Sequence, residues 1–333
     1  WVLAMTKLLE IRGDDSVINF ILLGIFLGLA FLAKYAAIYF LLSFLILIFT
    51  DKKILISLKG SVFGWFVFVL VFVLILLPNI YWNINNGWVT LSHTSDNANL
   101  KNLNLNVGGP LKFLVSQIFM VGPVLFLSFF YMFKYFSLDF ENKFLLIFSL
   151  PIIIIVLLES FLVRANANWA APALISLFIL FFRFVAEKKK SLIVINFGAN
   201  YMVAVFLFVS ILASSDSKMF DRIRGIDVFV KEVLKKTGSK DLVVSDRIIF
   251  SNISYEIRER SNNIYMPHKG GGAITNHFQM TSPLRPTMQN DFYLIGAQAD
   301  IKYLLKTNQT KLLKEFNVPF SSSKLKFYEV VFK

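Results

Sequence analysis

The sequence has no cysteine and few charged residues. Without cysteine no disulfide can form, so the chain is not a disulfide-stapled scaffold. Charged residues make up 17% of the 333 positions, against roughly 25% in an ordinary soluble domain. Apolar residues fill the deficit, reaching 56% of the chain and including 37 phenylalanines. This composition excludes a disordered chain and a simple cytosolic globule, and it indicates a polytopic membrane protein.

The beginning of the chain lacks the marks of a start. Its first residue is Trp1, and the first ten residues, WVLAMTKLLE, resemble the end of a helix. They lack the basic start, apolar core and small-residue cleavage site of a signal peptide. We therefore expect the sequence to be an N-terminally truncated fragment of a longer protein.

Apolar residues occur in long blocks before about residue 213, whereas the remainder reads as soluble sequence. We therefore expect a polytopic all-α membrane domain over 1–213 and a small soluble α/β domain over 214–333. A membrane helix needs about 20 mostly apolar residues. The candidate spans after the partial first helix are Val17–Ala33, Tyr35–Phe49, Gly60–Asn79, Leu111–Phe133, Phe144–Val163, Trp169–Ala186 and Ser191–Ala213.

The first two spans form one apolar stretch that only Lys34 interrupts. A single helix over this stretch would be about 50 Å long at 1.5 Å per residue. The hydrocarbon core of a membrane is only about 30 Å thick. We therefore expect two short helices that turn at Lys34.

Lysine and arginine are distributed unevenly between the two sets of connections. One set holds Lys7, Arg12, Lys52, Lys53, Lys59, Lys134, Lys143, Lys188, Lys189 and Lys190. The opposite short connections hold Lys34, Lys101 and Arg164. The positive-inside rule places the first set in the cytoplasm and the soluble domain on the opposite, periplasmic side. The net charge of +13 is therefore a topology signal, and no nucleic-acid partner is expected.

The residues after 213 alternate between helix and strand patterns. A helical pattern covers Phe220–Lys236, Asp241–Ser245 reads as a buried strand, and Ser245 or Asp246 can cap a helix that reaches about Glu259. Further expected strands are Ile264–Met266, Phe292–Ile295 and Phe327–Phe332. This alternation predicts a small α/β domain.

Three polar segments are expected to meet on the non-cytoplasmic face. The first surrounds Lys34 and Tyr35, where an ammonium group beside helix-end amides would attract a phosphate. A lysine that only reaches toward lipid headgroups is the alternative. The second is a loop with His93 and Asp96, which are spaced to share one helical face and could act as base and orienter. Solvent-exposed loop residues are the alternative there.

Aromatic and amide groups accompany these charges. In the loop, Trp82, Asn83 and Asn97 could bind a sugar, although a tryptophan can also be a simple interfacial anchor. The third segment runs from Arg164, whose guanidinium can bind phosphate oxygens. Its amides and ring suit sugar hydroxyls and sugar faces, or else a capped turn: Asn166, Asn168 and Trp169. No acidic cluster supports an essential metal ion.

Several segments together resemble a known family. They are Gly24–Tyr35 (GIFLGLAFLAKY), Pro78–Asn83 (PNIYWN), His93–Ala98 (HTSDNA), Gln117–Pro123 (QIFMVGP), Arg164–Pro172 (RANANWAAP) and Asn276–Phe278 (NHF). In order and spacing they resemble the GT-C class of polyprenyl-phosphate-dependent glycosyltransferases. These are bacterial relatives of the protein O-mannosyltransferases (glycosyltransferase family 39) and of the aminoarabinose transferases that modify lipid A.

The resemblance implies a multi-pass inner-membrane enzyme that transfers a sugar from a polyprenyl phosphate, with inversion, on the periplasmic side. The acceptor would be lipid A or lipopolysaccharide, a polysaccharide or a protein, and no cofactor is implied beyond the lipid-phosphate donor. Lys34 matches the lysine that contacts the donor phosphate in the lipid A-modifying relatives. The resemblance also implies a catalytic Asp upstream of Trp1. A membrane transporter and a non-catalytic scaffold with an extracytoplasmic binding domain are the alternatives.

Overall fold

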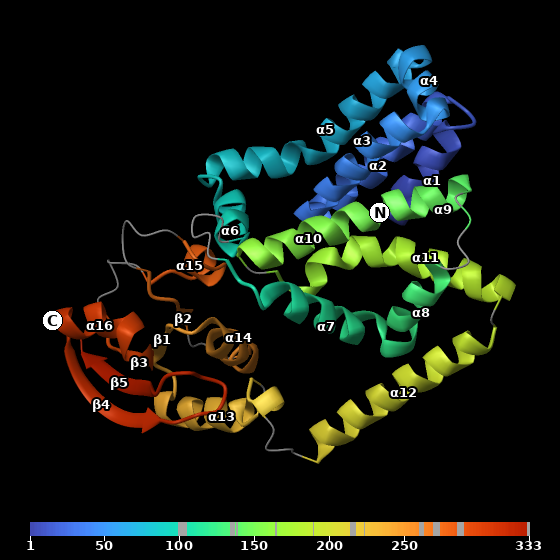
Figure 1. Cartoon of the computed structure of the whole chain (residues 1–333). Helices are drawn as coiled ribbons and strands as arrows, with labels where there is room; N and C mark the ends of the chain where they lie inside the picture. The colour runs from blue at the N-terminus through green and yellow to red at the C-terminus, as the bar shows by residue number, and fades with distance from the viewer. Residues whose placement is uncertain are drawn as a thin grey trace. The chain divides into compact units, whose positions relative to one another are not determined.

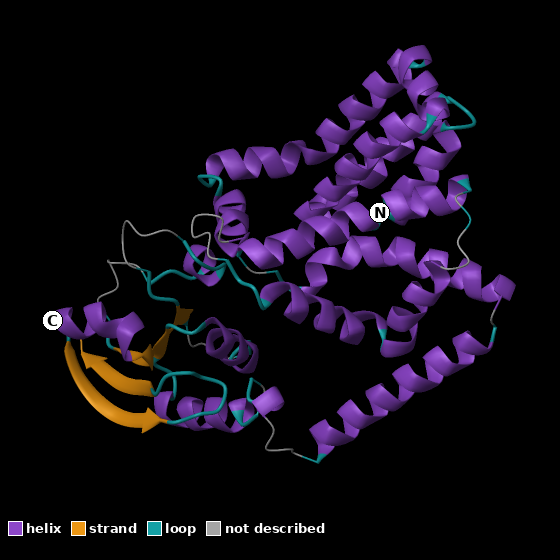
Figure 2. Cartoon of the chain, viewed as in Figure 1, coloured by secondary structure: helices purple, strands orange, loops and turns teal. Residues whose placement is uncertain are grey.

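A computed structural model describes residues 1–98, 105–133, 137, 139–163, 165–188, 190–213, 218–222, 224–259, 263–268, 274–284 and 290–331. The chain divides into two compact units, Trp1–Ala204 and Val205–Lys333. Within the described residues, unit 1 is helical and the strands belong to unit 2 (Figure 2). Each unit is described by itself.

Unit 1 consists of helices (Figure 1). They are α1 (Val2–Ile11), α2 (Val17–Ala33), η1 (Tyr35–Ala37), α3 (Ile38–Thr50), α4 (Lys52–Gly60), α5 (Val62–Asn85), α6 (Val89–Ala98), α7 (Gly109–Val121), α8 (Pro123–Phe133), α9 (Phe140–Ile147), α10 (Leu150–Leu162), η2 (Ala167–Ala170), α11 (Ala171–Lys188) and α12 (Ser191–Leu212). Among the described residues, the helices long and apolar enough to cross a membrane are Val62–Asn85, Phe140–Leu162, Ala167–Val185 and Ser191–Leu212, and the bent pair of α7 and α8 is a fifth if it counts as one span. Val17–Ala33 and Tyr35–Thr50 are shorter apolar helices.

The predicted turn at Lys34 is confirmed. Helix α2 ends at Ala33, Lys34 adopts an extended conformation (φ −162°, ψ 129°), and the short helix η1 leads into α3. The amide N–H of Lys34 still donates to the carbonyl of Ala30 at 3.0 Å. The long apolar stretch is therefore divided into two helices, and the lysine lies at their junction.

Glycines allow α2 and α5 to pack closely. A Cβ on Gly24 would lie 2.8 Å from the carbonyl oxygen of Phe68, and one on Gly28 would lie 2.7 Å from the side chain of Ile75. Gly64 on α5 likewise leaves room for the ring of Phe20. Because apolar helices in a membrane gain little from the hydrophobic effect, close backbone approach through small residues is what holds them together.

One predicted span is corrected by the structure. The sequence predicts a single helix over Leu111–Phe133, but the chain bends by 107° between α7 and α8. Gly122 occupies the break with φ +89°, a conformation that favours glycine, and Pro123 begins α8. The Gly-Pro pair was the sequence signal for this break.

The two arms of the bent pair contact different helices of unit 1. The amide of Asn106, just before α7, donates to the carbonyl of Phe161 at 2.7 Å, near the end of α10. On α8, the ring of Tyr131 packs on that of Phe184 in α11. The alternation of the later spans across the membrane stays a prediction.

The loops predicted to be cytoplasmic meet at one end of unit 1. Arg12 donates to both carboxylate oxygens of Asp51 at 3.2 Å and lies 3.5 Å from the centre of the Phe140 ring. Asp139 pairs with Arg183 at 3.3 Å. We call these residues the Arg12 end. Their grouping agrees with the predicted sets of loops, while the side of the membrane that this end faces stays a prediction.

Unit 2 is built on a mixed five-stranded sheet of order β2-β1-β3-β5-β4. Its elements are η3 (Lys218–Phe220), α13 (Ile226–Thr237), β1 (Asp241–Val244), α14 (Arg247–Glu256), β2 (Ile264–Tyr265), α15 (Phe278–Thr281), β3 (Phe292–Ala297), α16 (Gln298–Thr307), β4 (Gln309–Phe316) and β5 (Leu325–Val331). Strands β2, β1 and β3 are parallel, whereas β5 is antiparallel to both β3 and β4.

Side chains of successive strand residues enter different layers. Leu242 and Val244 pack with α13 and α14 in one core, while Val243 packs with Ile301 and Leu304 of α16 in another. This period of two is the expected pleat of a sheet buried on both faces. Helices therefore cover both sides of the sheet, as the predicted α/β domain requires.

Most of the predicted elements of unit 2 are confirmed, with three corrections. Helix α13 begins at Ile226, later than the predicted Phe220, because Gly225 has φ +73° and interrupts the pattern. Asp246 caps α14 as predicted, but this helix ends at Glu256, before Glu259. The prediction also missed α16 and β4, because Gln309–Phe316 carries mostly polar side chains at the sheet edge.

Candidate functional site

The structure brings two of the predicted polar segments together. The Nζ atom of Lys34 donates a hydrogen bond to the backbone carbonyl of Asn168 at 3.3 Å, across 134 positions of sequence. The lysine lies at the junction of α2 and η1, and Asn168 lies in η2. A lysine ammonium has three donor hydrogens. One bond to Asn168 fixes its position and leaves further donors for a ligand.

A polar network connects the second segment to the first. The hydroxyl of Tyr35 bonds to the side-chain oxygen of Asn79 at 3.1 Å and to the hydroxyl of Thr90 at 3.0 Å. The Thr90 hydroxyl in turn donates to the side-chain oxygen of Asn83. Asn83 is only 2% exposed, and its amide donates to Asn79. The network ties the beginning of α6 to the end of α5 and to Tyr35.

Pro78 explains how α5 reaches this network. Proline inside a helix removes one backbone hydrogen bond and bends the helix. Helix α5 contains Pro78, and Figure 1 shows its direction changing along its length. Asn79 and Asn83 follow the proline, four positions apart, and therefore present their amides on the same face.

The third segment is anchored from two directions. Besides the bond from Lys34 to Asn168, the amide of Gln117 on α7 donates to the carbonyl of Ala167 at 3.1 Å. Trp169 is half-buried and packs on an apolar cluster formed with Phe113 and Ile152. We call the residues joined by these bonds the Lys34 cluster: Lys34, Tyr35, Asn79, Asn83, Thr90, Gln117, Ala167 and Asn168.

The remaining predicted site residues are placed to different degrees. Trp82 is 40% exposed, in agreement with either a ligand contact or an interfacial anchor. Asn166 and Asn168 are exposed at the beginning of η2. Arg164 lies outside the described residues. The backbone of α6 includes three more predicted residues, whose side chains also lie outside the description: His93, Asp96 and Asn97.

The sequence interpretation missed two members of this region. Gln117 is 5% exposed and its carbonyl oxygen has no hydrogen-bond partner among the described residues. Glu159 is half-buried in the last turn of α10, a few positions before the third segment in the sequence. A carboxylate inside an apolar helix is a functional candidate on general grounds. Its isolation in the run LPIIIIVLLESFL was the signal that could have identified it.

The chemistry available to the Lys34 cluster is that of binding an anion beside a polar, hydrogen-bonding group. An exposed ammonium at the end of apolar helices attracts phosphate, because the low-dielectric surroundings weaken the screening of its charge. Exposed amides and aromatic rings nearby suit hydroxyl groups and sugar faces. A carboxylate, Glu159, lies in the same region.

Comparison with known proteins gives one informative similarity. The chain is 25% identical over 258 residues to the lipid A galacturonosyltransferase RgtD of Rhizobium johnstonii (strain DSM 114642 / LMG 32736 / 3841). The alignment covers 74% of this chain and 54% of the relative, so the chain spans about half the length of the curated protein it matches. No family model matches the sequence. No solved structure matches it either.

Proposed function

We propose that this chain forms part of an integral membrane glycosyltransferase that moves a sugar from a polyprenyl-phosphate donor to a lipid A-type envelope acceptor. The similarity to a lipid A galacturonosyltransferase supports the reaction class. The bond between Lys34 and Asn168 is the observation that carries the site, because it brings a cation and a hydrogen-bonding turn to one end of the apolar helices. The basic-residue bias supports the periplasmic side, and the inner-membrane location is what the family resemblance implies.

In the proposed reaction, an acceptor oxygen attacks the anomeric carbon of the donor sugar. The bond from that carbon to the phosphate oxygen breaks, and its electron pair stays on the polyprenyl phosphate. Lys34 stabilises the charge that develops on this leaving group, with Arg164 as a second cation. The acceptor proton passes to a carboxylate, which we place in the part of the protein upstream of Trp1.

Other residues line the proposed sugar pocket. Trp82 and Trp169 offer aromatic faces, and Asn97, Asn166 and Asn168 offer amides to sugar hydroxyls. Asn83 is buried within the network, so it positions the loop that carries these groups. On α6, His93 with Asp96 as its orienter is the second candidate for the base, after the upstream carboxylate.

The test uses the complete protein in proteoliposomes with radiolabelled polyprenyl-phosphate sugars and lipid A. We expect Lys34→Ala to lower transfer by about 100-fold or more, as removal of one donor to a developing negative charge does. Lys59→Ala is the matched control, since Lys59 is an exposed lysine in the last turn of α4. Near-normal turnover in Lys34→Ala, with the protein folded, would overturn the phosphate assignment.

A further inference from the structure

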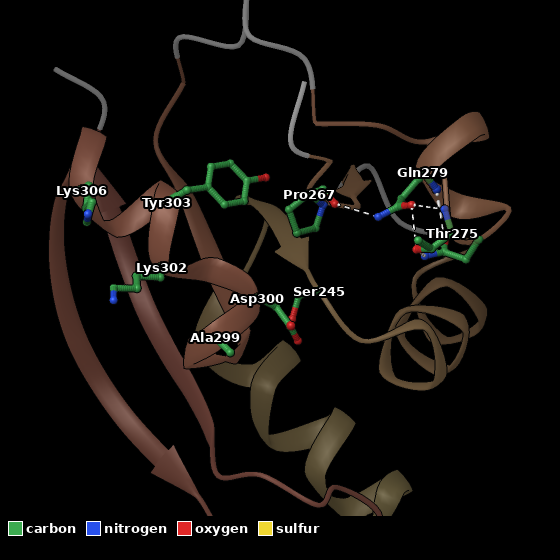
Figure 3. A pocket seen from close by; sticks show the side chains of 10 residues that line it. Ser245, Pro267, Thr275, Gln279, Ala299, Asp300, Lys302, Tyr303 and Lys306 are labelled. Atoms are coloured by element: carbon green, nitrogen blue, oxygen red, sulfur yellow. Dashed lines mark hydrogen bonds between the residues drawn. The ribbon is translucent and has the colours of Figure 1, made fainter. Parts of the chain in front are cut away.

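Unit 2 contains a polar cleft of about 610 Å³ that the proposed reaction does not use. Its lining comes from the end of β1, from α16, and from the segment around α15 (Figure 3). Its polar lining includes Ser245, Thr275, Gln279, Asp300, Lys302 and Lys306, and the ring of Tyr303 lies among them.

The cleft lies where the topology of the sheet reverses. Strand β1 has β2 on one side and β3 on the other, and all three are parallel. After β1 the chain continues through α14 to β2 on one side of the sheet, and after β3 it continues through α16 to β4 on the other side. These opposite directions leave a crevice between the carboxyl ends of β1 and β3. Ser245 directly follows β1, and α16 directly follows β3. Ligands of open α/β sheets bind in crevices of this kind.

An unpartnered hydroxyl lies in the lining of the cleft. The Oγ atom of Ser245 is buried and has no hydrogen-bond partner among the described residues. Buried polar atoms are almost always paired. A Cβ on Gly296 would lie 2.0 Å from this Oγ, so glycine at that position leaves the space that the hydroxyl occupies. A ligand that reaches Ser245 would supply the missing hydrogen bond.

One wall of the cleft is already held in shape. The side-chain oxygen of Gln279 accepts bonds from the amide of Thr275 at 2.8 Å and from its hydroxyl at 3.0 Å. The Gln279 amide donates to the carbonyl of Pro267 at 3.3 Å. The neighbouring ring of Phe278 stacks on Phe250 at 4.2 Å between centroids, which anchors this wall to the core. The wall includes Asn276–Phe278, the segment whose motif the sequence singled out.

The opposite wall is one face of α16. Lys302, Tyr303 and Lys306 line the cleft together with Ala299, at the i, i+3, i+4 and i+7 spacing of a single helical face. Tyr303 is half-buried, and Figure 3 shows its ring projecting toward Pro267 and Gln279. Burial raises the pKa of its phenol. Both lysines are exposed, and they place positive charge at the rim.

We propose that this cleft binds an anionic saccharide, a sugar that carries a phosphate or carboxylate group. The two lysines supply charge for the anionic group, the Tyr303 ring supplies an apolar face for the sugar ring, and Ser245 and Thr275 supply hydroxyls. Asp300 accepts from sugar hydroxyls at the same edge. That this saccharide is the headgroup of the acceptor rests on the proposed transferase function, whereas its binding to the cleft does not.

The test measures binding by the complete protein in nanodiscs, using glucosamine 1-phosphate and galacturonic acid as probes and saturation-transfer NMR as the readout. We expect both to bind. Neutral glucose should bind at least about tenfold more weakly, because it lacks a charged hydrogen bond worth roughly 1.4 kcal/mol or more. Inorganic phosphate should also bind at least about tenfold more weakly, because it lacks the sugar ring and hydroxyls. The double substitution Lys302→Ala and Lys306→Ala is expected to weaken the binding of the anionic probes to the level of glucose binding.

Control variants distinguish binding in the cleft from the effects of net charge and of misfolding. Lys311→Ala removes an exposed lysine on β4 and is expected to leave binding unchanged. Tyr303→Phe keeps the ring and is expected to weaken binding less than Tyr303→Ala. Equal binding of inorganic phosphate and sugar phosphate, or binding insensitive to the double lysine change, would overturn the proposal.

The same titration in the Lys34→Ala protein keeps the two hypotheses apart. Saccharide binding that persists without transfer supports the cleft whatever happens to the reaction. Displacement of the probe by lipid A vesicles identifies a glycolipid headgroup as the source, and binding without displacement identifies a free sugar phosphate or sugar acid.

Discussion

The two units place apolar side chains in opposite ways. In the part of α12 that belongs to unit 1, Val194 and Phe197 are more than 60% exposed, and the one buried residue within the described helix is the polar Asn196. In β1 of unit 2, Leu242, Val243 and Val244 are all buried. The hydrophobic effect explains unit 2, where apolar area is removed from water. The exposed apolar side chains of unit 1 are explained if lipid surrounds them, because apolar surface in contact with lipid does not have to be hydrated.

The two units must therefore be stabilised by different terms. Unit 2 gains roughly 25 cal/mol for each Å² of apolar surface that it buries. Between helices inside a membrane this gain disappears, and van der Waals packing and polar contacts remain as the stabilising interactions. The glycine contacts of α2 with α5 and the Lys34 cluster are such terms. Substitutions that disturb the packing of helices should therefore lower the stability of unit 1 most.

The largest stability effect is expected at a glycine of unit 1. Gly28→Ala would place a Cβ 2.7 Å from Ile75 and separate α2 from α5, at a cost of about 1–3 kcal/mol for overpacking. Gly198→Ala on α12 is the matched control, because its Cβ meets nothing within 4 Å among the described residues. It should be neutral or stabilising by up to about 1 kcal/mol. Thermal unfolding in detergent compares the two, and equal midpoints would contradict the packing argument.

A smaller effect is expected from a helix cap of unit 2. Asp246 accepts from the amides of Ile248 at 2.8 Å and Ile249 at 3.0 Å, so Asp246→Ala should cost about 1 kcal/mol. Ser16 occupies the same position on α2 of unit 1 but makes no side-chain cap bond. Ser16→Ala should therefore change little. Hydrogen exchange at the first turns of α14 and α2 measures both, and a larger loss of protection in α2 would refute the comparison.

The smallest effects depend on pH and have opposite signs in the two units. The pKa of Asp139 is lowered, first by the amide of Asn142 and then by Ser137 and Arg183. Its stabilisation is present above about pH 4 and is lost as pH falls through the lowered folded value. The pKa of Lys240 is raised, first by its hydrogen bond to Glu329. That contribution is present below about pH 10.4 and is lost as pH rises through the raised folded value.

Thermal midpoints of Asp139→Asn and Lys240→Gln, each compared with wild type across pH, measure these contributions. The difference for Asp139→Asn should disappear in acid, and that for Lys240→Gln should disappear in alkali. A difference that stays constant with pH would show that neither charge contributes through its ionisation.

The sequence predicted much of the fold because its strongest signals are local. Apolar runs marked the helices of unit 1, and Lys34 marked the break between α2 and η1. Asp246 marked the beginning of α14. The bend at Gly122 was missed because a run from Leu111 to Phe133 is apolar on both sides of it. Strand β4 was missed because an edge strand with polar side chains has no buried pattern.

The candidate site was predicted only in part. Lys34 and Asn168 were selected for their chemistry, and the structure joins them through a backbone carbonyl that no side-chain pattern reveals. Gln117 was overlooked because a glutamine in an apolar helix gives no sign of which loop it anchors. Asn83 was predicted to bind a sugar, whereas the structure buries it and directs its amide to Asn79.

The amino-acid order by itself determined which segments are apolar enough for a membrane, where α2 ends, and that a small α/β unit follows. These properties depend on hydropathy, period and capping within a few neighbouring residues. Tertiary structure alone decided that Lys34 meets Asn168, that Gly28 faces Ile75, and that Ser245 lies beside Tyr303 in one cleft. Such contacts join residues far apart in the chain, and only the packing of whole helices and strands fixes them.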